Sequence, residues 1–176
     1  MKSIKEKVAT SYDTFKGEFG YKNKMQAPRL MKVMVSSGVG SVLDKKRKEM
    51  IGDRLAKITG QKAKTTAAKK SIAGFKLREG EHVGYQITLR GARMYEFLEK
   101  LVHIALPRTR DFRGISPKGI DAMGNYSFGI KEHTIFPEAA EEDVRDVFGI
   151  GITVVTNCKT KKECEAFMRH IGLPLN

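Results

Sequence analysis

The chain has 176 residues, of which 40% are hydrophobic, and it carries 33 Lys and Arg against 20 Asp and Glu. This hydrophobic content excludes wholesale disorder, and the longest apolar run, residues 101–106, is too short to cross a membrane. The net charge of +13 favours a polyanionic partner, because neutralising phosphates releases condensed counterions. The length predicts a single domain over residues 1–176.

The first half of the chain is predicted to alternate helices and strands. Apolar residues at helical spacing indicate helices over residues 4–15 and 42–58. Alternation over residues 30–36 indicates a strand, which a tight SSGVGS turn at residues 36–41 separates from the second helix. Residues 62–70 are interpreted as a β-segment with a basic face.

The second half is predicted to begin with a loop at residues 74–81, a half-buried strand at 83–90 and a helix at 92–105. Residues 107–149 are predicted to form short strands at best, notably at 126–130. A strand at 150–154 and a C-terminal helix, which begins with a Thr160–Glu163 capping box, follow. This order indicates an α+β fold with one mostly antiparallel sheet. Its helices pack on one face, which leaves the other face and the loops free for RNA.

Charge is distributed unevenly along the chain. Residues 1–131 carry a net charge of +16, and the last thirty residues carry +2. Residues 132–146 hold one Arg and six acidic residues, a net of −5. A basic body with a local acidic patch predicts two partners of opposite charge.

The SSGVGS turn and the clusters around it are the candidate binding site. Backbone N–H groups of the turn, with the N-terminus of the following helix, would form an anion pocket that glycines let a ligand approach closely. The turn lacks the pattern of a P-loop or of a dinucleotide-binding fingerprint. An unliganded βα turn, and a solvated helix face for the Lys45–Lys48 run, are the plainer alternatives.

No residue set indicates catalysis, a cofactor or a metal. The four histidines lie far apart in sequence, and His103 is expected to be a structural histidine beside an apolar helical stripe. The Cys158, Cys164 and His170 spacing fits no zinc site, so both cysteines are expected to be packed thiols in a reducing cytosol. An N-terminal segment without an apolar region shows no secretory signal, and a cytoplasmic location is expected.

Long ordered blocks of the chain resemble a known family. MQAPRLMKVMVSSGVG, ITGQKAKTTAAKKSIAGFKLREGEHVGYQITLRGARMYEFLEKL, LPRTRDFRG, GNYSFGI and IFPE closely resemble bacterial-type ribosomal protein five of the large subunit, the universal 5S rRNA-binding family. The likeness runs from about Met25 to the C-terminus. It departs at Ser36, where the family usually has Asn, at residues 119–124 and at 139–150.

The resemblance implies a non-catalytic protein that helps to attach 5S rRNA in the central protuberance of the large subunit. Together with the basic clusters, it points to an rRNA-binding set: Ser36, Ser37, Gly38, Gly40, Ser41, Lys45, Lys62, Lys64, Thr65, Thr66, Lys69, Lys70, Thr88, Arg90 and Arg93. The implied contacts with the P-site tRNA are Phe75, Lys76, Arg78, Glu79, Gly80, Glu81 and His82. The implied bridge to small-subunit protein thirteen comprises Arg110, Phe112, Arg113, Glu138, Glu141, Glu142 and Asp143.

The implied partners are therefore 5S rRNA, large-subunit rRNA, P-site tRNA, small-subunit protein thirteen and other proteins of the central protuberance, with no membrane. Two other classes use the same basic surface. An RNA-modifying or RNA-processing enzyme would need a cofactor or metal site that the sequence does not show. A DNA architectural protein would prefer DNA over RNA in competition.

Overall fold

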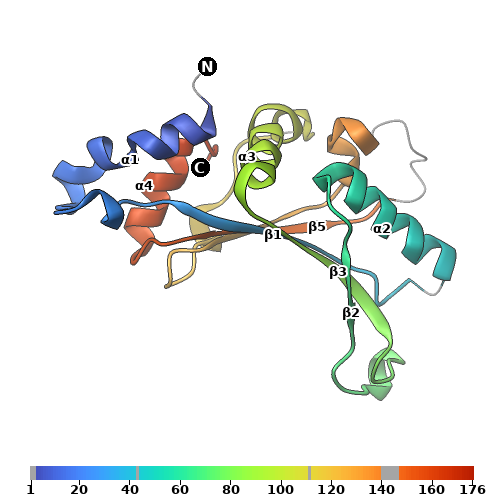
Figure 1. Ribbon diagram of the computed structural model, residues 1–176. Coiled ribbons are helices and arrows are strands. Elements are labelled where there is room, and N and C mark those ends of the chain that lie inside the picture. The colour runs from blue at the N-terminus through green and yellow to red at the C-terminus, as the bar shows by residue number, and fades with distance from the viewer. Residues whose placement is uncertain (1–2, 43, 111, 140–146) are drawn as a thin grey trace. The chain divides into compact units, whose positions relative to one another are not determined.

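The computed structural model describes residues 3–42, 44–110, 112–139 and 147–176 (Figure 1). The fold is α+β, with helices packed against a mostly antiparallel sheet, which confirms the predicted class. The helices are α1 (Ile4–Phe19), α2 (Lys45–Thr59), α3 (Gly91–Lys100) and α4 (Lys161–Ile171). The strands are β1 (Leu30–Gly38), β2 (Lys64–Ala67), β3 (His82–Leu89), β4 (Tyr126–Ile130) and β5 (Ile150–Thr156), in the order β2-β3-β1-β5-β4.

The chain folds as two compact units. Unit 1 comprises the residues up to Val33, then 90–128 and 153–176, and unit 2 comprises residues 34–89 and 129–152. The strands β1, β4 and β5 contribute residues to both units. The single domain expected from the length stays a prediction.

Unit 1 is built on three helices, and α1 and α4 lie side by side within it (Figure 1). A capping box formed by Ser3 and Glu6 begins α1, and the N–H of Ile4 donates to Oε1 of Glu99 at 3.0 Å. The apolar faces of these helices bury Phe15, Leu98 and Phe167. The unit therefore has its own hydrophobic core.

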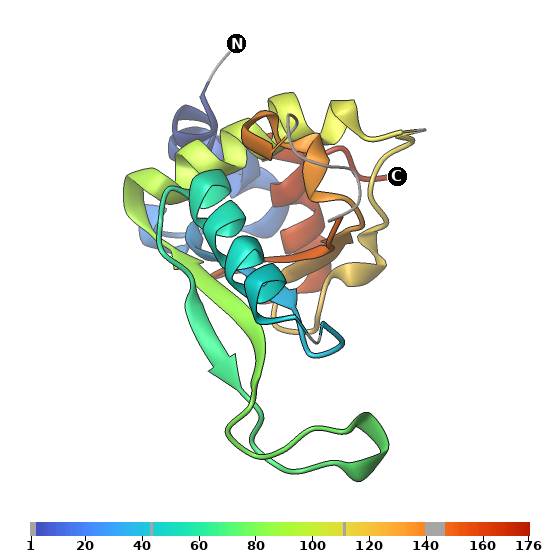
Figure 2. The same ribbon diagram turned by 90° about the vertical axis from the view of Figure 1, so that its right-hand side faces the viewer.

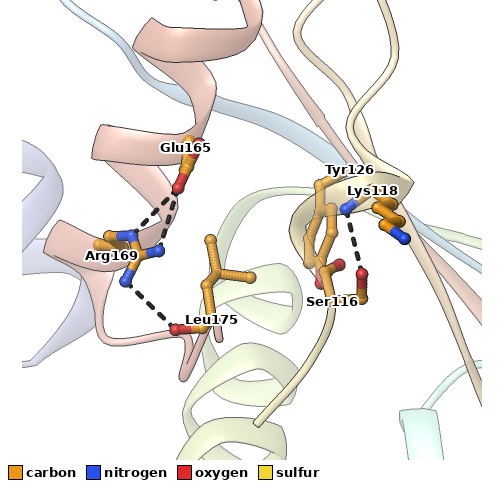
Figure 3. Close-up of polar contacts among 6 residues, drawn as sticks. All are labelled: Ser116, Lys118, Tyr126, Glu165, Arg169 and Leu175. Carbon is orange, nitrogen blue, oxygen red and sulfur yellow. Dashed lines mark hydrogen bonds and ion pairs between the residues drawn. The ribbon is translucent and has the colours of Figure 1, made fainter.

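Hydrogen bonds hold the C-terminal tail, residues 173–176, against the rest of unit 1 (Figure 3). The Arg169 guanidinium donates to Oε1 of Glu165 at 3.0 Å and to the carbonyl of Leu175 at 3.2 Å. The N–H of Ile115 donates to the Pro174 carbonyl at 2.8 Å. The tail thus forms part of the folded unit.

Unit 2 includes α2, which packs on β3, and the hairpin that β3 forms with β2. The apolar stripe of α2, Ile51, Leu55 and Ile58, is buried at i, i+4 and i+7. The hairpin pairs Lys64 with Gln86 and Thr66 with Gly84 in antiparallel register, and the register shifts after Thr66. Figure 2 shows the hairpin, in green, extending beyond α2 into the loop at residues 68–81.

Two helix boundaries differ from the predictions. The second helix begins at Lys45 rather than residue 42, because the Asp44 carboxylate accepts from the N–H of Lys46 at 2.9 Å and caps it. The helix predicted over residues 92–105 is regular only to Lys100 and continues as one π-helical turn to Ala105. Pro107 follows, and because it lacks an N–H it cannot extend a regular ladder.

Burial corrects one histidine and confirms the cysteines. His103 is exposed, contrary to the expectation of a structural histidine, whereas His133 is fully buried and stacks on Phe148 at 4.0 Å. Cys158 and Cys164 are buried free thiols, as predicted. Of the helices in the described parts of the chain, none combines the length and the apolarity that a bilayer crossing requires.

Candidate nucleic-acid interface

The turn between β1 and α2, in unit 2, offers two backbone donors. The N–H of Val39 donates to the Val83 carbonyl at 2.8 Å, and that of Val42 donates to the Val39 carbonyl at 3.1 Å. The N–H groups of Gly40 and Ser41 donate to no acceptor among the residues that the structure describes. Successive N–H groups of this kind form an anion seat.

The glycines of the turn have no structural reason to be glycine. Neither Gly38 nor Gly40 has a positive φ. A Cβ on Gly38 would meet nothing within 4 Å, and one on Gly40 would make an ordinary 3.9 Å contact with Val83. By contrast, a Cβ on Gly84 would lie 2.9 Å from Oγ1 of Thr66. Packing therefore requires glycine at Gly84 but leaves the turn glycines open to an approaching partner.

The first two of the three serines of the turn, Ser36 and Ser37, differ in exposure. The Ser37 hydroxyl is buried and donates to the Gly149 carbonyl at 2.8 Å, so it stabilises unit 2. Ser36 is exposed and donates to the Gly151 carbonyl at 3.4 Å. Of the Ser36 and Ser37 hydroxyls, both of which were predicted to bind rRNA, only that of Ser36 lies on the surface.

The start of α2 is basic, as the sequence indicated, but one of its lysines makes a hydrogen bond within the unit. Its first turn holds no acidic residue, and Lys45 and Lys46 are exposed. The Lys48 ammonium, however, donates to the His82 carbonyl at 3.1 Å. Because Asp44 already caps the helix, the candidate anion seat consists of the turn N–H groups rather than the helix N-terminus.

A cavity of about 450 Å³ lies beside this seat, in unit 2. Asp44 and Arg47 contribute charges of opposite sign to its wall. The full lining is Gly38, Ser41, Val42, Asp44, Arg47, Ile51, Val147, Phe148 and Gly149. Ser41 of the candidate seat therefore borders this cavity.

The remaining cations of unit 2 fall into two groups. Lys62 and Lys64 are exposed and follow the C-terminal end of α2. This 15-residue helix is about 22 Å long, so that end lies far from its start. Lys69 and Lys70, also exposed, follow the Ala67–His82 pair, and His82 is the residue that Lys48 contacts. Thr65 is exposed on β2 and Thr66 is half-buried. The sequence already placed basic residues before and after this helix, and the strand pairing adds that Lys69 and Lys70 return toward its start.

The loop at residues 68–81 is held by its own hydrogen bonds. The Ala68 N–H donates to the Glu81 carbonyl at 2.8 Å, and the Gly80 N–H donates to the Ala68 carbonyl at 3.0 Å. A bridge joins Ile72 to Leu77 around a 3₁₀ turn. The loop is thus a small second hairpin on the end of the first.

Some side chains of this loop are exposed to solvent, whereas others make hydrogen bonds within the loop. Phe75 is 74% exposed, and Lys76, Arg78, Glu79 and Gly80 are exposed as well. The Glu81 carboxylate accepts from the Arg78 N–H at 3.2 Å, and the His82 ring donates to the Gly84 carbonyl at 2.9 Å. Glu81 and His82 hold the loop together, and the His82 ring is half-buried.

Other predicted residues are divided between the units. Thr88 is half-buried in β3 of unit 2, whereas Arg90 and Arg93 are exposed at the start of α3 in unit 1. For the predicted bridge, Arg110 and Arg113 are exposed and Phe112 half-buried in unit 1, and Glu138 is exposed in unit 2. Glu141, Glu142 and Asp143 lie outside the described residues.

The comparisons with known proteins agree along nearly the whole chain. Residues 23–78 match the family model of ribosomal protein L5, and residues 82–175 match the model of the C-terminus of the same ribosomal family. Large ribosomal subunit protein uL5 of Heliobacterium modesticaldum is 49% identical over 177 residues, covering 99% of this chain and 98% of that protein. Its counterpart in Geobacter sulfurreducens is 49% identical over 158 residues, covering 89% and 88%. The chain belongs to the ribosomal protein L5 family.

Membership of the L5 family fixes the broad role. The chain is a structural, rRNA-binding constituent of the large subunit of the cytoplasmic ribosome, and it is not an enzyme. Within the parts of the chain that the structure describes, no group of three or more His, Cys, Asp or Glu is placed to hold a metal ion. His170, the third residue of the Cys158, Cys164 and His170 spacing, uses its ring nitrogen to donate a hydrogen bond to the Lys7 carbonyl at 2.8 Å.

Unit 1 also contains a cationic cluster that the sequence did not single out. Hydrogen bonds join residues 21–29 to residues 157–163, although more than a hundred residues separate them. The cluster comprises Lys22, Lys24, Arg29, Lys159, Lys161 and Lys162. Its signal in the sequence is that residues 20–33 and 157–162 contain seven Lys and Arg and no acidic residue.

Proposed function

We propose that this L5 family protein binds 5S rRNA through unit 2 and helps to attach it in the central protuberance of the large subunit. The observation that carries the proposal is the β1–α2 turn. Its Gly40 and Ser41 N–H groups have no acceptor among the described residues, and its glycines leave the backbone open. A backbone that is bare of side chains and offers unpaired donors suits a phosphate.

In this proposal the turn positions the RNA and the cations strengthen the attachment. One phosphate accepts from the turn N–H groups, and lysines at the two ends of α2 neutralise further phosphates along the backbone. Exposed hydroxyls at Ser36 and Thr65 are placed to meet ribose 2′-OH groups or phosphates. Phosphate contacts of this kind set register and affinity, so discrimination depends on the shape of the folded RNA.

Binding of 5S rRNA against a structured RNA of equal length and unrelated sequence tests the proposal. The full chain should bind 5S rRNA more tightly at 0.15 M salt. Changing Lys64, Lys69 and Lys70 to Gln should weaken that binding by about four- to fivefold for each phosphate that is no longer neutralised, from a salt slope of about 0.7–0.9 per phosphate. Equal affinity of the wild-type chain for both RNAs would overturn the proposal.

We further propose that the loop at residues 68–81 contacts the P-site tRNA. The loop extends from unit 2 on a two-stranded hairpin, and its internal hydrogen bonds preform its tip. Exposed Phe75 is flanked by Lys76 and Arg78. An aromatic ring beside cations suits stacking on unpaired bases together with neutralisation of phosphate.

The bridge to small-subunit protein thirteen is the third part of the proposal. The acidic segment around Glu138 has the charge that a basic protein partner requires, and Arg110 and Arg113 are exposed. An electrostatic bridge of this kind mainly raises the association rate and weakens with salt.

A further inference from the structure

We propose that the cationic cluster of unit 1, Lys22, Lys24, Arg29, Lys159, Lys161 and Lys162, is a second RNA-binding surface that takes the phosphate backbone of structured rRNA. This inference rests on the proposed function and adds to it a separate contact surface. The proposal above uses the turn and the α2 cations of unit 2. This cluster contains none of those residues.

The cluster is assembled by specific contacts rather than by chance proximity. The Asn157 side chain donates to the Ala27 carbonyl at 3.0 Å and accepts from the Arg29 N–H at 2.6 Å. The N–H of Asn157 donates to the Arg29 carbonyl at 3.3 Å, and the Tyr21 hydroxyl donates to the Glu163 carboxylate. The segment after α1 is thereby clamped against the start of α4.

The six cations are presented to solvent. All six residues are exposed, and among the described residues none of their side chains makes a hydrogen bond or an ion pair. The nearby Glu163 is buried and already accepts from the Tyr21 hydroxyl and from the Lys159 N–H at 2.8 Å. Its carboxylate therefore faces inward and neutralises the surface little.

One exposed acid lies near the edge of the cluster. Hydrogen bonds from the side chain and N–H of Asn125 lower the pKa of Asp121, and the charge of Lys161 lowers it further. Glu18, whose charge acts on Tyr21, is a second exposed acid nearby, and six cations against these two carboxylates leave a positive surface. Such a surface attracts a polyanion.

The position of the lysines points to a partner rather than to stability. Lys161 and Lys162 are the first two residues of α4, an 11-residue helix that begins after the Thr160 cap. Cations at a helix N-terminus oppose the helix dipole and destabilise the helix. The first turn of α2 in unit 2 also begins with lysines, there without the acidic residue that Glu163 adds to the first turn of α4. Residues that break a local stability rule are expected where function requires them.

A charge-neutralising variant with a matched control tests the proposal. In the full chain, Lys159, Lys161 and Lys162 are changed to Gln, and the control changes Lys5, Lys16 and Lys118, which are exposed lysines of unit 1 outside the cluster. Both variants lose the same net charge. Binding to 5S rRNA and to full-length large-subunit rRNA is measured by fluorescence anisotropy from about 0.05 to 0.4 M KCl, a range over which phosphate contacts weaken strongly.

The cluster variant should bind at least one of the two RNAs more weakly, by about four- to fivefold per phosphate at 0.15 M salt, with a salt slope lower by about 2 to 3. The affinity of the control should fall clearly less. The melting temperature of the cluster variant should rise rather than fall, which separates weaker binding from impaired folding.

A second variant, in which Lys22, Lys24 and Arg29 become Gln, should show the same weakening from the other half of the cluster. Equal affinities and slopes for the cluster and control variants, on both RNAs, would overturn this proposal while leaving 5S rRNA binding by unit 2 intact. Failure of the wild-type chain to prefer 5S rRNA would instead overturn the proposed function.

Discussion

The sharpest prediction concerns a single added methyl group at the turn. In Gly40→Ala the new Cβ makes an ordinary 3.9 Å contact with Val83, and the φ of Gly40 is not positive. Replacing glycine by alanine at a compatible position stabilises a protein by about 0.4–1 kcal/mol, by restricting the unfolded chain. For a chain of this length that raises the melting temperature by roughly 1–4 °C.

The same methyl group should damage RNA binding, because it stands beside the N–H proposed to seat a phosphate. Loss of one hydrogen bond to a charged group costs about 1.5–3 kcal/mol. That energy corresponds to a roughly 10- to 150-fold weaker affinity for 5S rRNA. Thermal unfolding and equilibrium RNA binding on the same preparation measure the two opposite effects.

Gly84→Ala serves as the reference substitution. Its Cβ would lie 2.9 Å from Oγ1 of Thr66 and 3.0 Å from the Ser37 carbonyl oxygen, so neighbouring strands must shift. Overpacking of this kind costs about 1–3 kcal/mol of stability. If Gly40→Ala melted lower than wild type, or bound 5S rRNA with unchanged affinity, the assignment of the open turn to an RNA partner would be refuted.

Four further outcomes are expected. Arg78→Ala should leave 5S rRNA affinity nearly unchanged but weaken retention of P-site tRNA on assembled ribosomes, and equal damage to both would contradict the division of labour. Ser37→Ala should cost about 0.5–1.5 kcal/mol of stability, because a buried hydrogen bond is removed, with an unchanged salt slope of RNA binding. The pKa of Asp121 is lowered in the folded state, chiefly by the Asn125 side chain, so the ionised carboxylate should stabilise the protein at neutral pH. This stabilisation should be lost as the pH falls from about 4 through the lowered pKa. In Asp121→Asn the free energy of unfolding should therefore depend less on pH in that window. Reversing Glu141 and Glu142 to Lys should weaken subunit association mainly at low magnesium, as light scattering or sedimentation would show.

Periodicity alone predicted most of the fold. The alternation around β1 and β3 and the helical stripe of α2 were clear, because each element buries one face. Boundaries depended on contacts that the pattern did not reveal. The Asp44 cap shortens α2, and the turn before Pro107 widens into a π-helix. Both boundaries are determined by hydrogen bonds of the backbone, which the pattern of hydrophobic residues does not specify.

The sequence predicted which types of residue form the candidate binding site, but not which of them make hydrogen bonds within the fold. Lys48 and Ser37 belong to basic or turn motifs, yet each makes a hydrogen bond inside unit 2 that sequence cannot show. The cationic cluster of unit 1 was missed because its halves lie far apart along the chain and are connected through Asn157 and Tyr21. His103 was assigned to the core from helical spacing, although the widened turn leaves it exposed.

Mapping the contacts by ultraviolet cross-linking of the full chain to 5S rRNA, followed by mass spectrometry, tests the central claim most directly. We predict cross-linked peptides from residues 36–42 and from residues 62–70 of unit 2. Cross-links that avoid both segments, in a complex with wild-type affinity, would contradict the claim that the open turn and the cations around α2 hold the RNA.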